Sequence, residues 1–311
     1  MSHEIIFHHY WTSPFSEKVR LVFGMKGLSW RSVEVPNMMP KPDLMPLTGG
    51  YRKTPVMQIG ADIFCDTQII LRELERRFPD PPTMPNEGFS FALGFWADKA
   101  FFLATVPLVF GELGENVPEA FVKDREKMAP DRPFNLQQMK AAAPLLKDQW
   151  RAHVGFVDAQ LRDGRSFVSL AHGGGKPTVS DAHCYMNLWF LKSALPDLAI
   201  SLLGEFLRVE AWYERVRAIG HGAPSPMDAK EALRVAREAT PEALRLADPH
   251  DPSGRKPGDR VSVTPDDYGR DPVTGEIVFS NAQEIAIKRS DPTVGEVVVH
   301  FPRAGFWVMP V

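Results

Sequence analysis

The sequence is poor in the residues that build covalently closed or metal-held folds. Its 311 residues include only two cysteines, Cys65 and Cys184, which lie far apart and outside any CxxC or Cys/His spacing. This argues against a disulfide framework and against a structural zinc site, so we expect no bound metal. Free cysteines at this low frequency are typical of a reducing compartment, which predicts a cytoplasmic protein.

The sequence also lacks long runs of one charge and long apolar runs. The formal net charge is −3, and no lysine- or arginine-rich stretch is present, so we expect no nucleic-acid partner. No segment approaches the ~18 consecutive apolar residues of a membrane span, so we expect no membrane partner. The first residues, MSHEIIFHHYW, have neither the basic nor the apolar region of a signal peptide.

The first 80 residues alternate between strand and helix patterns. Short apolar or alternating runs indicate strands, and the spacing of apolar residues indicates helices that stop at Gly27 and Pro79. The expected elements are a strand at 4–8, a helix at 17–26, a strand at 30–35, a hairpin around 59–61 and a helix at 67–78. This order predicts a mixed sheet with helices packed against it.

Two changes of character divide the remainder. A proline-dense stretch at 79–87 precedes a region from about Phe89 to Leu244 that has helical patterns throughout. After Asp248 follow five short strand candidates, which suit a small barrel or sandwich. They read DRVSV, GEIVF, EIAIKR, GEVVVHF and GFWVM. We therefore expect an α+β multidomain protein, with domains at 1–80, 88–245 and 256–311.

A hydroxyl-rich motif lies where the first strand meets the first helix. It runs from Tyr10 to Arg20 and reads YWTSPFSEKVR. A hydroxyl placed just before a helix can donate a hydrogen bond to a thiolate, and the helix N-terminus also favours an anion. Ser13 is the first candidate for this role. Thr12, Ser16 and Tyr10 are rivals, and the simplest alternative is that Ser13 only caps the helix.

Three further motifs follow along the chain. Thr54-Pro55 opens a strand, where a proline cannot donate a ladder hydrogen bond and so needs a special reason. Asp66-Thr67 begins a helix, whose N-terminus favours a ligand carboxylate. Thr178-Val179-Ser180-Asp181 has the spacing of a capping box, with Asp in place of the usual Glu or Gln.

In this order over residues 1 to roughly 225, these motifs resemble the cytosolic glutathione S-transferase family, with the Ser-Pro-Phe sequence similar to serine-type and omega- or tau-like members. The resemblance implies a thioredoxin-like domain followed by an all-helical domain. The small β-rich, barrel-like segment at the C-terminus lies outside the family pattern.

The resemblance also implies the roles of the motif residues. A cis bond at Pro55 would present the backbone of Thr54 to the cysteinyl part of glutathione, and Asp66 and Thr67 would hold its γ-glutamyl end. Ser13 would activate the thiol. Ser16 and Lys53 complete the expected glutathione-binding set, and the capping box would have a structural role. The alternative for the proposed binding residues is that they only form turns, cap helices or carry a solvated charge.

Aromatic residues are candidates for a second-substrate pocket. Trp11 lies in the loop beside Ser13, and the aromatic-rich helix contributes Trp96 and Phe102, although such a stripe is more often core. Asp98, inside this apolar helix, is expected to cap or pair. Cys65 is expected to be core, and one of His8 and His9 is expected to point inward as a buried histidine with hydrogen-bond partners.

We therefore expect a homodimeric enzyme that conjugates glutathione, its co-substrate, to a small hydrophobic electrophile. Glutathione-dependent thioltransfer is a weaker alternative, because that chemistry usually needs cysteine where Ser13 stands. A non-catalytic glutathione-binding or protein-interaction module is the third reading, since a fold alone does not imply a function.

Overall fold

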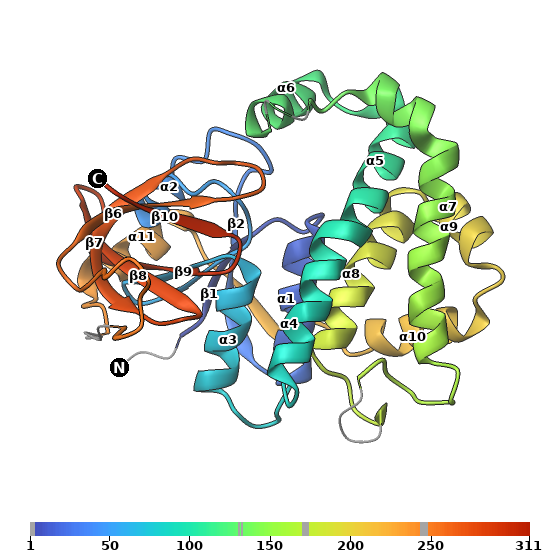
Figure 1. Ribbon diagram of the computed structural model, residues 1–311, viewed down its shortest axis with the longest axis horizontal. Coiled ribbons are helices and arrows are strands. Elements are labelled where there is room, and N and C mark those ends of the chain that lie inside the picture. The colour runs from blue at the N-terminus through green and yellow to red at the C-terminus, as the bar shows by residue number, and fades with distance from the viewer. Residues whose placement is uncertain (1–3, 130, 132, 170–173, 243–247) are drawn as a thin grey trace.

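The computed structural model describes residues 4–129, 131, 133–169, 174–242 and 248–311. Figure 1 shows the strand-rich part of the chain on one side and a helical part on the other, with α6 standing above and between them.

The N-terminal part folds as its pattern predicts. Its elements are β1 (Ile6–His9), α1 (Pro14–Met25), β2 (Ser29–Glu34), α2 (Met45–Thr48), β3 (Val56–Ile59), β4 (Asp62–Cys65) and α3 (Thr67–Arg77). β1 pairs with β2 in parallel and with β3 antiparallel, and β3 and β4 form the expected hairpin. The short helix α2, within the proline-rich stretch, was not predicted.

The following region is helical, also as predicted. Its elements are α4 (Glu87–Phe95), the π-helical turn η1 (Trp96–Phe101), α5 (Phe102–Leu113), the 3-10 turn η2 (Gly114–Asn116), α6 (Glu119–Met128), α7 (Leu136–Gln160), α8 (Val179–Ala194), α9 (Pro196–Leu203) and α10 (Leu207–Arg217). The predicted helix at 199–219 is two helices, separated at Gly204.

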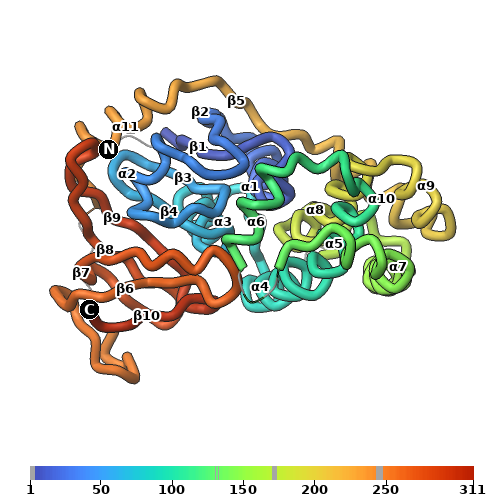
Figure 2. The backbone as a smooth tube through the Cα atoms, turned by 90° about the horizontal axis from the view of Figure 1, so that it is seen from above, coloured from blue at the N-terminus to red at the C-terminus, as the bar shows by residue number. Residues whose placement is uncertain are grey.

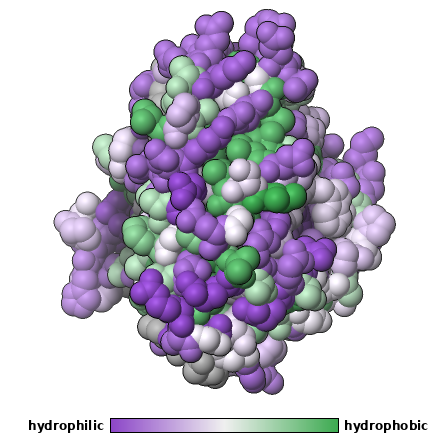
Figure 3. Space-filling model, turned by 90° about the vertical axis from the view of Figure 1, so that its right-hand side faces the viewer, coloured by the Kyte–Doolittle hydropathy of each residue, from purple (hydrophilic) through white to green (hydrophobic). Residues whose placement is uncertain are grey.

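The run Glu87–Asn116 is apolar enough, by length and composition alone, to cross a membrane. This run is not an uninterrupted apolar stretch, since it contains Asp98 and Lys99, and the expectation that there is no membrane partner stays a prediction. Within the run, α4 and η1 pack on α8, and α5 packs on α7 and α8. The helical face that Figure 3 turns toward the viewer carries hydrophobic patches among hydrophilic side chains. Exposed apolar residues of α7 and α9 include Leu145, Phe156 and Ile200.

Two elements after α10 return to the sheet. β5 (Ala223–Pro226) pairs in parallel with β2, and α11 (Ala229–Glu238) packs on β2, α2 and β9. The sequence pattern assigned α11 to the helical region, because an amphipathic helix does not reveal which apolar surface it covers.

The five C-terminal strands form where they were predicted. They are β6 (Arg260–Pro265), β7 (Val273–Ser280), β8 (Glu284–Asp291), β9 (Gly295–Pro302) and β10 (Phe306–Pro310). The barrel-like closure expected for them does not occur. Because β9 pairs in parallel with β4, the strands continue the N-terminal sheet, in the order β10-β6-β7-β8-β9-β4-β3-β1-β2-β5 (Figure 2).

The two faces of the N-terminal strands belong to different cores, since side chains alternate along a strand. Met57 and Phe64 join a core with α1, α3 and the helical region. Val56 and Ile63 join a second core with β6–β10. The β-rich segment therefore shares its core with the N-terminal domain.

Candidate active site

Ser13 lies at the entrance to α1. Its side chain is 1% exposed, and its hydroxyl accepts a hydrogen bond of 3.1 Å from the backbone N–H of Ser16, so Ser13 is the N-cap of this helix. The helix begins directly after it, at Pro14, which is a favoured residue at the first helical position. Capping uses the hydroxyl oxygen as an acceptor and leaves its proton free to be donated. The capping role and a thiol-activating role are therefore compatible.

The three rival hydroxyls occupy different positions. Tyr10 lines the same cavity as Ser13, and its phenol lies near Ser13 and Arg125. Burial raises the pKa of Tyr10, so its phenol stays protonated at neutral pH. Thr12 is exposed and also lines this cavity. Ser16 is fully buried and lines neither cavity at this site.

The Thr54–Pro55 peptide bond is cis, as the resemblance implies. The Thr54 side chain accepts a hydrogen bond of 2.8 Å from the Lys41 ammonium, which also donates to the Arg52 carbonyl at 2.9 Å. Sequence reasoning missed Lys41, which lies in an irregular stretch with no motif. Burial, followed by the nearby charges of Arg125 and Arg52, lowers the pKa of Lys41 to about 7.

A cavity of about 610 Å³ opens beside Ser13 and Thr54. Its walls are mostly apolar side chains from α5, α6 and α8 and from the segment before α7; they include Phe102, Phe110, Phe121, Phe134 and Phe190. Lys41, Arg52 and Arg125 line the same cavity, and the latter two share Asp124 as an ion-pair partner. The cavity therefore combines a mostly apolar lining with more cationic than anionic side chains.

A smaller cavity of about 70 Å³ lies at the start of α3. Thr54, Pro55, Asp66 and Thr67 line it, so the structure brings these four predicted residues together. Asp66 is the N-cap of α3 and accepts from the Gln68 N–H at 2.9 Å. Burial raises the pKa of Asp66.

Asp98 is paired, as expected. The buried ammonium of Lys18 donates to both of its carboxylate oxygens at 2.7 Å and to the Thr67 hydroxyl at 3.2 Å. Asp98 stands in the π-helical turn η1, an irregularity that is frequent at functional sites. It lines both cavities, and burial raises its pKa.

Lys53 also lines both cavities, but its charge already has a partner. The ammonium donates to Asp267 at 2.7 Å and lies 4.6 Å from the ring centroid of Tyr268. Both residues belong to the loop between β6 and β7, and both line the two cavities. No sequence signal indicated that the C-terminal strands reach this site.

The expected aromatic walls are only partly brought together. Phe102 lines the large cavity, whereas Trp11 and Trp96 line neither cavity. Trp11 is 41% exposed and donates to Glu34 at 2.7 Å, while Trp96 donates to His153 at 3.2 Å. Neither indole is therefore part of the site as the two cavities define it.

The residues expected to have structural roles either cap a helix or are buried in the core. Thr178 and Asp181 form the capping box of α8, and Asp181 also accepts from the Trp212 indole at 2.8 Å. Cys65 is buried in the second core. His8 and His9 are buried with hydrogen bonds to Gln58 and Ser32. In the part of the chain that the structure describes, no cluster of side chains suits a metal ion.

Comparison with known proteins agrees with this geometry. The model of the glutathione S-transferase N-terminal domain matches residues 7–82. Glutathione S-transferases U4 and U1 of Arabidopsis thaliana are 27% and 29% identical over 89 and 115 residues, or 28% and 35% of this chain. The chain spans 40–50% of the length of these plant relatives.

A solved structure extends the similarity to the whole chain. The crystal structure of a GST-like protein from Pseudomonas syringae is 38% identical, with a TM-score of 0.81, and the alignment covers 100% of both chains. The similarity therefore includes the C-terminal strands, which the plant alignments do not establish. With its thioredoxin-like and helical domains, this chain belongs to the glutathione S-transferase family.

Proposed function

We propose that this protein binds glutathione and conjugates its thiol to a small hydrophobic electrophile. The observation that carries the proposal is that Ser13 lines the large, mostly apolar cavity, while Thr54 lines both this cavity and the smaller one, whose lining is more acidic. Glutathione has a zwitterionic γ-glutamyl end, a thiol in the middle and a glycine carboxylate at the other end. The lining groups complement each part in the same order.

The γ-glutamyl end would bind in the small cavity. The N-terminus of α3 favours its carboxylate, and the Asp66 side chain favours its ammonium group. The cysteinyl backbone would pair with Thr54. The glycine carboxylate would extend to Lys41, whose ammonium has no carboxylate partner at hydrogen-bond distance among the described residues.

The thiol would then lie next to the Ser13 hydroxyl. A free thiol has a pKa of about 8.5, so little thiolate exists at neutral pH without help. A hydrogen bond donated by Ser13, together with the positive end of α1, would stabilise the thiolate, and the thiol proton would pass to water. The thiolate sulfur would form its new bond to an electrophilic carbon held in the apolar cavity of about 610 Å³. In a substitution, that carbon loses its bond to an anionic leaving group, which departs to water; in an addition, the π-bond of an activated alkene breaks and water protonates the resulting carbanion.

The test is glutathione binding by calorimetry, with thiolate absorbance recorded in the ultraviolet. Ser13→Gly removes the hydroxyl and costs the helix cap only a few tenths of a kcal/mol, whereas Ser13→Thr keeps a hydroxyl. We expect the wild type and Ser13→Thr to bind and ionise the thiol, and Ser13→Gly to bind without ionising it.

Matched variants separate the rivals. Tyr10→Phe, Thr12→Ala and Ser16→Ala each remove one of the other hydroxyls. Loss of thiolate in one of these variants, with ionisation kept in Ser13→Gly, would transfer the activating role to that residue. Binding without ionisation in the wild type would favour the non-catalytic binding module, and no binding at all would reject the proposal.

We further propose that the protein acts as a homodimer in a reducing, cytoplasmic compartment, as the sequence predicts. Cys65 and Cys184 are both buried free thiols, which is compatible with that compartment. Sedimentation velocity across a range of protein concentrations tests the dimer, and a single species with the mass of one chain would contradict it.

A further inference from the structure

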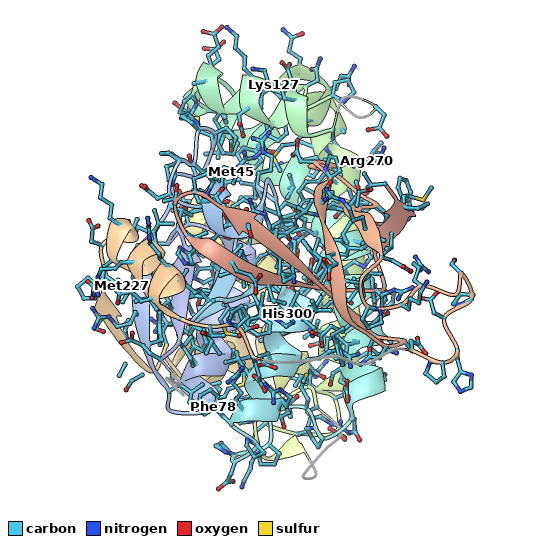
Figure 4. All side chains as sticks on the ribbon, turned by 90° about the vertical axis from the view of Figure 1, so that its left-hand side faces the viewer. Met45, Phe78, Lys127, Met227, Arg270 and His300 are labelled. Atoms are coloured by element: carbon cyan, nitrogen blue, oxygen red, sulfur yellow. The ribbon has the colours of Figure 1, made fainter. Side chains whose placement is uncertain are left out.

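The loop between β6 and β7 reaches the glutathione site from the C-terminal strands. Asp267 pairs with Lys53, Asp266 pairs with Lys99 at 3.3 Å, and the Gly269 N–H donates to the Met128 carbonyl at 2.6 Å. In Figure 4, Arg270 of this loop lies toward the end of α6, on which Lys127 is labelled. The loop is therefore held against both other parts of the molecule.

The small cavity has one more carboxylate than it has cations to pair with. Asp98, Asp266 and Asp267 each have a lysine partner, Lys18, Lys99 and Lys53 in turn. Asp66 has no ion-pair partner among the described residues, and its side-chain hydrogen bond is with a backbone N–H. If all four carboxyl groups are ionised, one of them has no salt-bridge partner, and a cationic ligand group would supply it.

Carboxylate oxygens remain available in this cavity. Among the described residues, Asp66 and Asp267 both use Oδ1 for their hydrogen bonds: Asp66 with the Gln68 N–H, and Asp267 with Lys53 and the Tyr268 N–H. The Oδ2 atom of each has no such partner. Two residues that line this cavity, from different parts of the chain, therefore each have a carboxylate oxygen without a hydrogen-bond partner.

A buried histidine in the same cavity points independently to a ligand. His183 is 1% exposed and lines the cavity, yet neither ring nitrogen has a hydrogen-bond partner in the described part of the chain. A side chain at Gly94 would collide with this ring, since its Cβ would lie 2.7 Å from the imidazole. Burial lowers the pKa of His183 well below its usual value, so the ring stays neutral, with one nitrogen able to accept a hydrogen bond and the other able to donate one.

We propose that Asp267 of the C-terminal strands is a ligand-recognition residue, which accepts the α-ammonium group of the γ-glutamyl residue together with Asp66. This inference rests on the proposed function and adds that the third segment of the chain completes the glutathione site. A volume of about 70 Å³ has room for an ammonium group, since a water molecule occupies ≈ 30 Å³ in the liquid.

The test uses two ligands that differ only in this amine. Binding of glutathione and of glutaryl-cysteinyl-glycine, which lacks the α-amino group, is measured by calorimetry on wild type and Asp267→Asn. The asparagine keeps an oxygen for Lys53 and replaces the other oxygen by a donor. We expect the Kd for glutathione to rise at least tenfold and the Kd for the deamino ligand to change less than twofold.

Asp271→Asn is the matched control. It removes a charge of the same sign from the same loop, and Asp271 is exposed and lines neither cavity, so both Kd values should change less than twofold. Thermal unfolding of each variant checks that the fold is kept.

Three results would overturn the inference. Tighter binding of both ligands by Asp267→Asn would show that the loop competes with glutathione for Lys53. Equal weakening of the binding of both ligands, or no change in either Kd, would show that Asp267 only supports the wall of the cavity and does not bind the amine. In these cases wild type still binds glutathione, whereas a wild type that binds neither ligand would reject the proposed function and this inference together.

Discussion

His300 of β9 donates a hydrogen bond of 3.0 Å to Asp62 of β4, across the junction between the C-terminal strands and the N-terminal sheet. Its other ring nitrogen lies 2.7 Å from Glu284 of β8, and the ring stacks on Phe64. Figure 4 shows His300 near the middle of the sheet. A buried imidazolium between two carboxylates thus joins the two parts.

This pair predicts a loss of stability in alkaline solution. Burial alone would lower the pKa of His300, but its hydrogen bonds with Asp62 and Glu284 raise it to about 9. A raised pKa stabilises the fold below the unfolded value of 6.5, and the gain disappears as the pH rises through 9. The free energy of unfolding should fall by roughly 3 kcal/mol over this range.

Urea unfolding at pH 6.5, 8 and 9 measures this fall, with His300→Gln as the control. The variant should be less stable than wild type at pH 6.5, and the difference should shrink as the pH rises. Other titrating groups are common to both proteins, so a difference that does not depend on pH would contradict the assignment.

Because of Lys41, we expect the binding of glutathione's glycine carboxylate to weaken as the pH rises from 6 to 8. Its pKa of about 7 means that the ammonium loses its charge over this range. A hydrogen bond to a charged group contributes about 1.5–3 kcal/mol, so the full loss corresponds to at least about tenfold in Kd. S-methylglutathione is the suitable ligand, because it has no ionisable thiol. Lys41→Arg should make the Kd independent of pH, and an unchanged pH dependence in this variant would exclude Lys41 as its source.

Asp181 is expected to be essential for the stability of the helical domain. Its carboxylate accepts from the Trp212 indole and from the backbone N–H groups of Val168 and Thr178. Asp181→Ala leaves three buried donors without a partner and should cost roughly 3–5 kcal/mol. Trp212→Phe removes only one of these bonds and should cost less. Unfolding free energies test the order, and equal losses for the two variants would contradict it.

The buried pair Lys18–Asp98 predicts a strong coupling. Lys18→Met leaves the Asp98 carboxylate without its cation and should destabilise the protein by about 3–5 kcal/mol. The double variant Lys18→Met/Asp98→Leu should recover much of this loss, because no buried charge remains. Additive losses in the double-mutant cycle would show that the pair is not coupled.

Local patterns predicted most of the elements. Strand alternation, helix caps and turn residues act over a few residues, so they place β1 to β4, the capping box of α8 and the five C-terminal strands. The hydroxyl-rich motif and the Thr54-Pro55 and Asp66-Thr67 pairs are local too, and the structure brings most of these residues to one site.

The remainder depends on contacts between distant residues. Nothing in the sequence GEVVVHF indicates that its partner is β4, so the single ten-stranded sheet was not predicted. The contact between Lys53 and Asp267 was not predicted for the same reason, because the two residues are far apart in the sequence. β5 was missed because the sequence APSP has two prolines and is typical of a loop.

The pairing of β4 with β9 has a consequence for synthesis on the ribosome. Asp62 and His300 are 238 residues apart, and translation adds ≈ 5–20 residues per second, so β4 waits roughly 10–50 seconds for its neighbour. During this interval the nascent chain carries an open strand edge and half of an apolar core, which other chains can contact. Premature termination after the helical domain would therefore release an aggregation-prone product, even though its thioredoxin-like and helical segments are complete.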